Sequence, residues 1–326
     1  MKSVKVDDLQ IGMYVNLGKG LSSNTILEAQ FLIQNERQIA NIMDQGLESV
    51  AVDPARSNVD ISDYDDSTTE LDVPDDFDPL ENIAAGLQET IQDENITPRE
   101  KAKAVYDHSI QMMKAILQKP SSENILHGKE MIATLVDHIL VDDSTAECLT
   151  QITSHDFYTY THSVNVGMYG VLLAKAIYKG APDHNMKELG AGFFLHDLGK
   201  CEVPADLINK PGKLTAAEWE MMRMHPTYGE RILANSNHLN ETIRPIVVQH
   251  HEREDGSGYP SGRKGPHIHE YARICTIADV YDALTSTRSY KKKLSAIEAL
   301  RVMKEEMISH FNQEMFGHFV KLFIKH

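Results

Sequence analysis

The chain has 326 residues, a formal net charge of −16 at pH 7 and an apolar fraction of 41%, which is ordinary for a globular protein long enough to form two domains. No run of about 18 apolar residues occurs, so a membrane-spanning helix is not expected. The N-terminus lacks the apolar core of a secretory signal. Three widely spaced cysteines, Cys148, Cys201 and Cys275, form no CxxC pair. Both features favour a reducing cytoplasm.

The negative charge is concentrated in one stretch of the chain. Between Ser57 and Pro98 there are thirteen Asp or Glu and no Lys or Arg, so the remainder is close to neutral. The total charge therefore says little about a binding site elsewhere. The absence of a basic face argues against binding to a nucleic acid polymer.

Residues 1–56 are predicted to form a small α/β domain. Short apolar runs, VKVDDLQIGMYVNL and LESVAVD, lie on either side of a helical stretch, NERQIANIMDQG, in which Gly46 has the place of a C-cap. Residues 57–97 include SDYDDSTTELDVPDDFDP, and this composition predicts a solvated acidic linker.

Residues 98–326 are predicted to form one all-helical domain, which makes the expected fold class mainly α. Apolar positions recur there at helical spacing, in two clear stripes: Ile132, Leu135, Val136 and Ile139, and Val166, Tyr169, Leu173 and Ile177. The exception is the segment 252–269, where four glycines and two prolines break the helical pattern. An ordered loop of that length is usually functional.

Polar residues stand at the edges of several apolar helices, where burial is costly unless each is satisfied by a partner. They are His162, His196, Asp197, His225, His250, His251 and Asp279. One such histidine is most often a hydrogen-bonded structural residue, but the joint pattern indicates a shared metal cluster. Imidazole and carboxylate ligands suit iron, manganese, zinc or nickel. Seven ligands are too many for one ion with an open position, whereas two bridged ions would activate a shared water and clamp a phosphate.

Basic residues accompany this set in the sequence. Lys200 follows His196 by about one turn, so the two are predicted to project from the same side of a helix. A lysine there could neutralise a phosphate oxygen or protonate a leaving oxygen. Arg288 and Lys291 follow Asp279 and add positive charge near the predicted site.

The segments HDLGK, KPGKLTAAEWEMMRMHP, HHEREDGSGYP and ARICTIADVYDALTSTRSYK together resemble the HD-GYP domain, a branch of the HD superfamily of metal-dependent phosphohydrolases. The resemblance extends from about residue 150 to about residue 320, and its name-giving triplet is intact as Gly258, Tyr259 and Pro260. The first fifty residues also resemble a domain of unknown function that is often fused in front of HD-GYP domains.

The resemblance implies a phosphodiesterase that hydrolyses a cyclic dinucleotide second messenger. Cyclic di-GMP would be converted to pGpG and GMP, or cyclic GMP-AMP would be cleaved, by attack of a hydroxide bridging two divalent ions. Iron or manganese would be preferred, with zinc or nickel as alternatives. It also implies that one ion is held by His162, His196, Asp197 and Asp279 and the second by His225, His250 and His251, with Asp197 bridging.

Further roles follow from the same resemblance. Lys200 and Asp197 would serve catalysis, and phosphate would be contacted by Lys200, Arg288 and Lys291. Tyr259 would shape the substrate pocket, and the loop glycines would let the backbone approach the dinucleotide. Some members bind a third ion through a glutamate one turn before the first histidine. Here Tyr158 has that position, so we expect two ions.

Other functions stay open at the level of sequence. The chain could be a non-catalytic sensor of a cyclic dinucleotide, or a module that docks a signalling protein, although the intact ligand set argues against both. A phosphohydrolase acting on mononucleotides is a further alternative, against which the intact Gly258-Tyr259-Pro260 triplet argues. The choice between cyclic di-GMP and cyclic GMP-AMP, the native metal and the oligomeric state are also left open.

Overall fold

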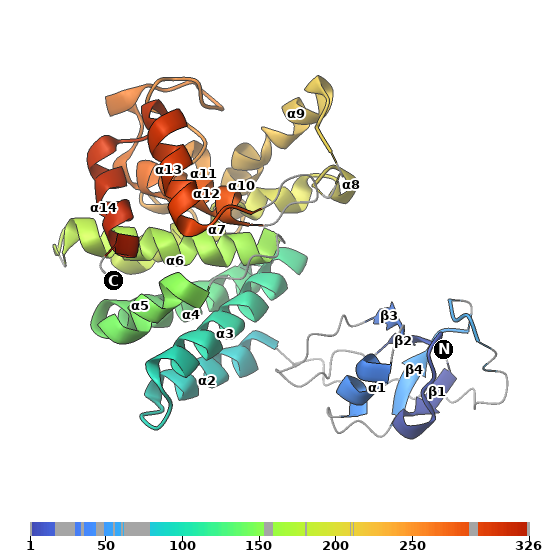
Figure 1. Cartoon of the computed structure of the whole chain (residues 1–326). Helices are drawn as coiled ribbons and strands as arrows, with labels where there is room; N and C mark the ends of the chain where they lie inside the picture. The colour runs from blue at the N-terminus through green and yellow to red at the C-terminus, as the bar shows by residue number, and fades with distance from the viewer. Residues whose placement is uncertain are drawn as a thin grey trace. The chain divides into compact units, whose positions relative to one another are not determined.

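The chain folds into two compact units, residues 1–78 and residues 79–326 (Figure 1). The computed structural model describes residues 2–16, 30–33, 36–43, 49–54, 56–59, 61, 79–152, 159–179, 181–208, 210, 212–286 and 293–324. The predicted fold class, mainly α with a small N-terminal sheet, is confirmed. None of the helices in these ranges has the length and apolarity needed to cross a membrane.

The N-terminal unit is built on a four-stranded sheet in the order β1-β4-β2-β3, with every pair antiparallel. Alternating valines explain its core, because Val4 lies opposite Val50 and Val15 lies opposite Val52, and all four are buried. The position predicted as a helix C-cap, Gly46, lies outside the described residues. The elements are β1 (Lys2–Lys5), η1 (Val6–Asp8), β2 (Tyr14–Asn16), β3 (Gln30–Leu32), α1 (Glu36–Met43) and β4 (Ser49–Val52).

The second unit is helical throughout its described residues, apart from its loops and short 3-10 turns. Its elements are α2 (Pro79–Gln92), α3 (Pro98–Gln118), α4 (Ser122–Val141), α5 (Asp143–Ile152), α6 (Thr159–Tyr178), α7 (Met186–Leu195), η2 (Leu198–Glu202), α8 (Ala205–Ile208), α9 (Ala216–Met222), α10 (His225–Asn235), α11 (Ile243–Gln249), η3 (Gly265–His267), α12 (Glu270–Thr285), α13 (Ala296–Glu306), η4 (Ile308–His310) and α14 (Gln313–Ile324).

Helix α6 is the centre of this unit. Its residues 161–174 are all buried, and it packs against α3 on one side and against α12 and α14 on the other (Figure 1). Two glycines bring α7 close to it, because a Cβ on Gly167 would lie 2.3 Å from the Phe194 ring and one on Gly170 would lie 2.6 Å from the Phe193 ring. The approach of α7 to α6 carries His196, which directly follows the last residue of α7, toward His162 near the start of α6.

Residues 79–92 correct one prediction, because they form α2 instead of part of an acidic linker over 57–97. Leu80 and Leu87 on this helix are fully buried, and the helix packs against α3 and α4. Its apolar residues recur at helical spacing, while its glutamates face solvent. The acidic composition of the segment concealed this stripe, so the helical unit begins near residue 79 instead of residue 98.

Candidate metal centre

The structure brings all seven predicted ligand residues together in one cluster of the helical unit. Two sets can be defined, and within each set the candidate ligand atoms lie within 4.8 Å of one another. One set is Asp197, His225, His250 and His251, and the other is His162, His196 and Asp279. Asp197 also faces the second set, since its Oδ2 lies 3.4 Å from His162 Nε2. This arrangement matches the grouping that the resemblance implies, and metal binding by it remains a prediction.

Three of the histidines follow the last residue of a helix by one to three residues, and each ring is held there in the same way. The Nδ1 atoms of His196, His225 and His250 lie 2.8, 2.7 and 2.9 Å from the carbonyl oxygen three residues earlier in the chain. Those carbonyls belong to the last turns of α7, α9 and α11, where backbone acceptors have no helical partner. A carbonyl can only accept, so in the neutral form of each ring Nδ1 carries the proton and Nε2 presents a lone pair.

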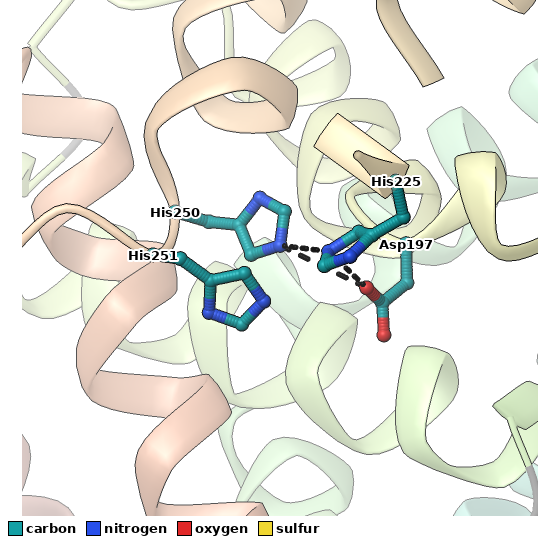
Figure 2. Close-up of side chains that lie close together, drawn as sticks. All are labelled: Asp197, His225, His250 and His251. Atoms are coloured by element: carbon teal, nitrogen blue, oxygen red, sulfur yellow. Dashed lines mark hydrogen bonds and ion pairs between the residues drawn. The ribbon is translucent and has the colours of Figure 1, made fainter. Parts of the chain in front are cut away.

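The lone pairs of two rings face each other. The Nε2 atoms of His225 and His250 lie 3.2 Å apart (Figure 2). Burial lowers the pKa of both imidazoles, more than their contacts with Asp197 raise it, so both rings are neutral near pH 7. Two acceptors at this distance repel unless a cation lies near both. The donor set therefore fits a divalent cation, with Asp197 Oδ1 supplying charge 3.2 Å from His225 Nε2.

The surroundings of His162 favour its protonated form, in contrast to those of His225 and His250. Its Nε2 lies 3.2 Å from Asp279 Oδ1, and its Nδ1 lies 2.7 Å from Asp282 Oδ2. Burial alone would lower the pKa of His162, but hydrogen bonds to Asp197, Asp279 and Asp282 raise it well above its usual value. Burial likewise favours protonation of Asp279, yet its hydrogen bond to His162 and the nearby histidines hold the pKa of that carboxyl below its usual range.

Two buried polar atoms of the cluster make no hydrogen bond among the described residues. They are His196 Nε2 and Asp197 Oδ1. His196 Nε2 lies 3.5 Å from Asp197 Oδ2, which is an electrostatic contact only. Leaving such atoms unpartnered costs about 1–3 kcal/mol each, more for a charged group. A cation coordinated by both atoms would remove this cost, so the cluster fits the metal that the residue types suggest.

The short 3-10 turn η2 places Lys200 beside the cluster, and this corrects the expected helix. Helix α7 ends at Leu195, so His196 and Lys200 do not share a helical face. The turn packs tightly against α10, because a Cβ on Gly199 would lie 1.9 Å from the carbonyl oxygen of His225. Lys200 Nζ forms an ion pair with Asp197 Oδ2, and its side chain is 15% exposed.

The loop after His251 covers one side of the cluster. The ring of Tyr259 stacks on that of His251, with centroids 4.6 Å apart, and the Arg223 guanidinium lies 5.4 Å from the Tyr259 ring centroid. A Cβ on Gly258 would lie 2.4 Å from the carbonyl oxygen of His251. At this position the glycine is needed for the loop to approach its own backbone, a reason that differs from the expected approach to a dinucleotide.

Two carboxylates with clear structural roles were missed by sequence reasoning. Glu252 is buried and accepts hydrogen bonds from the backbone N–H groups of Ser261 and Arg263, at 2.8 and 2.9 Å, which ties the start of the loop to its middle. Asp282 is buried behind His162. A signal existed for each: Glu252 directly follows the histidine pair, and Asp282 lies one helical turn after Asp279.

Arg288, Lys291 and Tyr158 lie outside the described residues. Their predicted phosphate contacts, and the two-ion count inferred from Tyr158, therefore stay predictions.

Two protein families match parts of this chain. Residues 171–315 match the HD domain family, and residues 1–127 match a domain of unknown function, DUF3391. The chain therefore contains an HD domain, preceded by a DUF3391 region, as the sequence led us to expect. The HD match includes every predicted ligand except His162, which precedes it. The DUF3391 match extends past the boundary between the two compact units and into α4.

Several curated proteins are similar to part of this chain. A cyclic di-GMP phosphodiesterase of Pseudomonas aeruginosa is 38% identical over 195 residues, which are 60% of this chain and 46% of that protein. A 3'3'-cGAMP-specific phosphodiesterase of Vibrio cholerae is 34% identical over 185 residues, 55% of this chain and 40% of its own length. A cyclic di-GMP phosphodiesterase of Thermotoga maritima is 35% identical over 178 residues, 54% of this chain and 48% of its own. The chain thus spans about half, or less, of these relatives.

A solved structure shares the fold. An HDG"Y"P protein of Bdellovibrio bacteriovorus superposes with a TM-score of 0.63 and covers 98% of both chains, at 15% sequence identity. At that identity the likeness supports the fold alone.

Proposed function

We propose that this protein is a metal-dependent phosphodiesterase that hydrolyses a cyclic dinucleotide, either cyclic di-GMP or 3'3'-cGAMP. The contact that carries the proposal is the one between His225 Nε2 and His250 Nε2, 3.2 Å apart with both Nδ1 protons committed elsewhere. Such a pair is built to share a cation. The names of the relatives supply the substrate class.

The proposed centre holds two divalent ions, with iron or manganese preferred and zinc or nickel as alternatives. When bound, two such ions would lower the pKa of a water molecule and neutralise charge on a phosphate. The first would be held by His162, His196, Asp197 and Asp279, and the second by His225, His250 and His251, with Asp197 shared. The structure's two sets fit this division.

The exposure of the side chains indicates where the phosphodiester would approach. His251, Lys200 and Asp279 retain 22, 15 and 11% exposure, whereas the remaining five predicted ligands are at most 2% exposed. The scissile phosphate would therefore enter on the side of these three residues. Lys200 would bring its ammonium to a phosphate or leaving oxygen there.

Tyr259 is proposed to shape the pocket on the same side. Its ring lies on His251, so a base or ribose entering next to the phosphate would meet this aromatic face. Arg288 and Lys291 are proposed as additional phosphate contacts. Cys148, Cys201 and Cys275 are free thiols, which supports the proposed cytoplasmic location.

The proposal is tested by metal analysis together with hydrolysis assays. Purified protein, reconstituted without oxygen with Fe²⁺ or Mn²⁺, should bind about two ions per chain and convert one or both cyclic dinucleotides to a linear product. Asp197→Ala should abolish turnover, and His267→Ala, an exposed histidine on η3, should not. Binding without turnover would identify a sensor, and turnover of mononucleotides alone would identify a different HD phosphohydrolase.

A further inference from the structure

Behind His162, three buried polar side chains form a continuous chain of hydrogen bonds. Asp282 Oδ2 lies 2.7 Å from His162 Nδ1, Asn165 Nδ2 donates to Asp282 Oδ1 at 2.6 Å, and the Tyr106 hydroxyl donates to Asn165 Oδ1 at 2.8 Å. Asp282, Asn165 and Tyr106 are only 1, 1 and 4% exposed. We call these three residues the relay. It joins α12, α6 and α3 in the interior of the helical unit.

In the relay, the donor and acceptor roles in one hydrogen bond fix those in the next. The carboxylate of Asp282 accepts, so His162 Nδ1 must carry a proton and Asn165 must present its amide NH₂ group. The amide oxygen of Asn165 then points the other way and needs a donor, which Tyr106 provides. Only one orientation of the amide and one tautomer of the neutral His162 ring satisfy all three contacts. That tautomer leaves the Nε2 lone pair directed at Asp197 and Asp279.

The relay also explains how His162 differs from the other histidines of the cluster. His196, His225 and His250 are fixed by carbonyls of adjacent helix ends, whereas His162 depends on a side chain 120 residues later in the sequence. Its direction is therefore set by the packing of α6 against α12 and, through Tyr106, of α3 against α6.

We propose that Asp282, Asn165 and Tyr106 are positioning residues for metal binding by His162. Asp282 fixes the tautomer and direction of the ring, Asn165 holds Asp282, and Tyr106 holds the amide of Asn165. The inference rests on the proposed function, in which His162 is a metal ligand. Tyr106 also lies within the region that matches DUF3391, so this region contributes directly to the order of the HD-domain site.

The test measures metal binding without substrate, on the full chain stripped of metal and titrated with Mn²⁺. Asp282→Asn should lower the affinity for one of the two ions about 10- to 100-fold, the range for partners that orient metal ligands, and leave the affinity for the other ion unchanged. Tyr106→Phe should lower the affinity for the same ion by a smaller factor. Ser109→Ala is the matched control on α3, because it removes a buried hydroxyl whose single hydrogen-bond partner among the described residues is the carbonyl of Val105.

A second readout separates positioning from general destabilisation. In the ¹⁵N spectrum of histidine-labelled protein, the His162 signal, assigned with His162→Gln, should shift in Asp282→Asn and Tyr106→Phe but stay in Ser109→Ala. If the three residues had a merely structural role, the affinities for both ions would fall together, in proportion to the loss of Tm.

The outcomes distinguish this inference from the proposed function. Failure of the unsubstituted protein to bind Mn²⁺ would overturn both. Two bound ions in the unsubstituted protein, with the same affinities in Asp282→Asn, would overturn the positioning role alone. Should Asp282→Asn not fold, Tyr106→Phe decides, and affinities equal to those of Ser109→Ala would refute the relay.

Discussion

Lys200 Nζ forms an ion pair with Asp197 Oδ2, the carboxylate oxygen that also lies 3.4 Å from His162 Nε2. The lysine is delivered by η2, three residues after the aspartate, and it is one of the few side chains near the cluster that retain exposure. It therefore introduces a positive charge at the edge of a largely buried cluster of five histidines and two aspartates.

Replacing this charge should impair chemistry more than metal binding. Lys200→Met is expected to lower kcat by about 10²-fold or more, the usual contribution of a positioned proton donor or charge, while two ions still bind. Lys213→Met, an exposed lysine outside the cluster, is the control and should have no effect. Steady-state kinetics with metal analysis of each variant provides the measurement. Unchanged kcat in Lys200→Met would remove this residue from the mechanism.

Metal binding should depend on pH differently at the two sets. Burial keeps the pKa of His225, His250 and His251 below the usual value, so these rings are neutral at pH 7 and need lose no proton. The raised pKa of His162 means that its ring must release a proton when it binds a metal ion. One ion should therefore bind more tightly as pH rises, by up to about tenfold per pH unit for one proton, until His162 is deprotonated.

Mn²⁺ titrations at several pH values, repeated in buffers of different ionisation enthalpy, would check this expectation. The second ion should show a much flatter pH dependence in the same range, because its histidines are already neutral. Equal slopes for both ions, or no proton release, would contradict the charge assignment.

The close contact of η2 with α10 should make Gly199 intolerant of any side chain. Gly199→Ala would place a Cβ 1.9 Å from the carbonyl oxygen of His225, which forces the backbone to move and costs about 1–3 kcal/mol or more. Gly317→Ala is the opposite case, since among the described residues no atom beyond its chain neighbours and its own helix backbone lies within 4 Å of a Cβ there, and the residue is in helix α14. Alanine at 317 should raise the free energy of unfolding by up to about 1 kcal/mol. Urea unfolding of both variants gives the comparison.

The carboxylate of Glu252 should control the order of the loop. Glu252→Ala removes the acceptor of two backbone N–H groups, so the amides of Ser261 and Arg263 should exchange with solvent faster and KM for substrate should rise. Asp255→Ala, an exposed carboxylate of the same loop, should leave those two amides unchanged. Hydrogen exchange followed by NMR would reveal the difference. Equal protection in the two variants would show that Glu252 does not hold the loop.

The cluster could be predicted from sequence because most of its members stand near the ends of apolar helices, a pattern visible in the local sequence, although Asp279 lies inside α12. Partners that depend on tertiary packing were not visible in this way. Asp282 reaches His162 only because α12 packs on α6, and the sequence separation of 120 residues conceals the contact. Helix α2 was missed for a different reason, since the acidic composition of the segment 57–97 outweighed the spacing of Leu80 and Leu87. The position of Lys200 was misjudged because α7 gives way to a 3-10 turn.

The hydrogen bonds from three predicted ligands to carbonyls in the last turns of α7, α9 and α11 have a practical consequence. Each of these rings caps the C-terminal end of a helix, whether or not an ion is bound. An alanine substitution at His196, His225 or His250 therefore deletes a cap together with a candidate ligand. Loss of activity in such a variant could therefore result from the lost cap or from the lost ligand, and the assay alone would not tell the two apart. Asp197 and Asp279, whose side chains make no capping hydrogen bond, are the cleaner positions at which to separate coordination from folding.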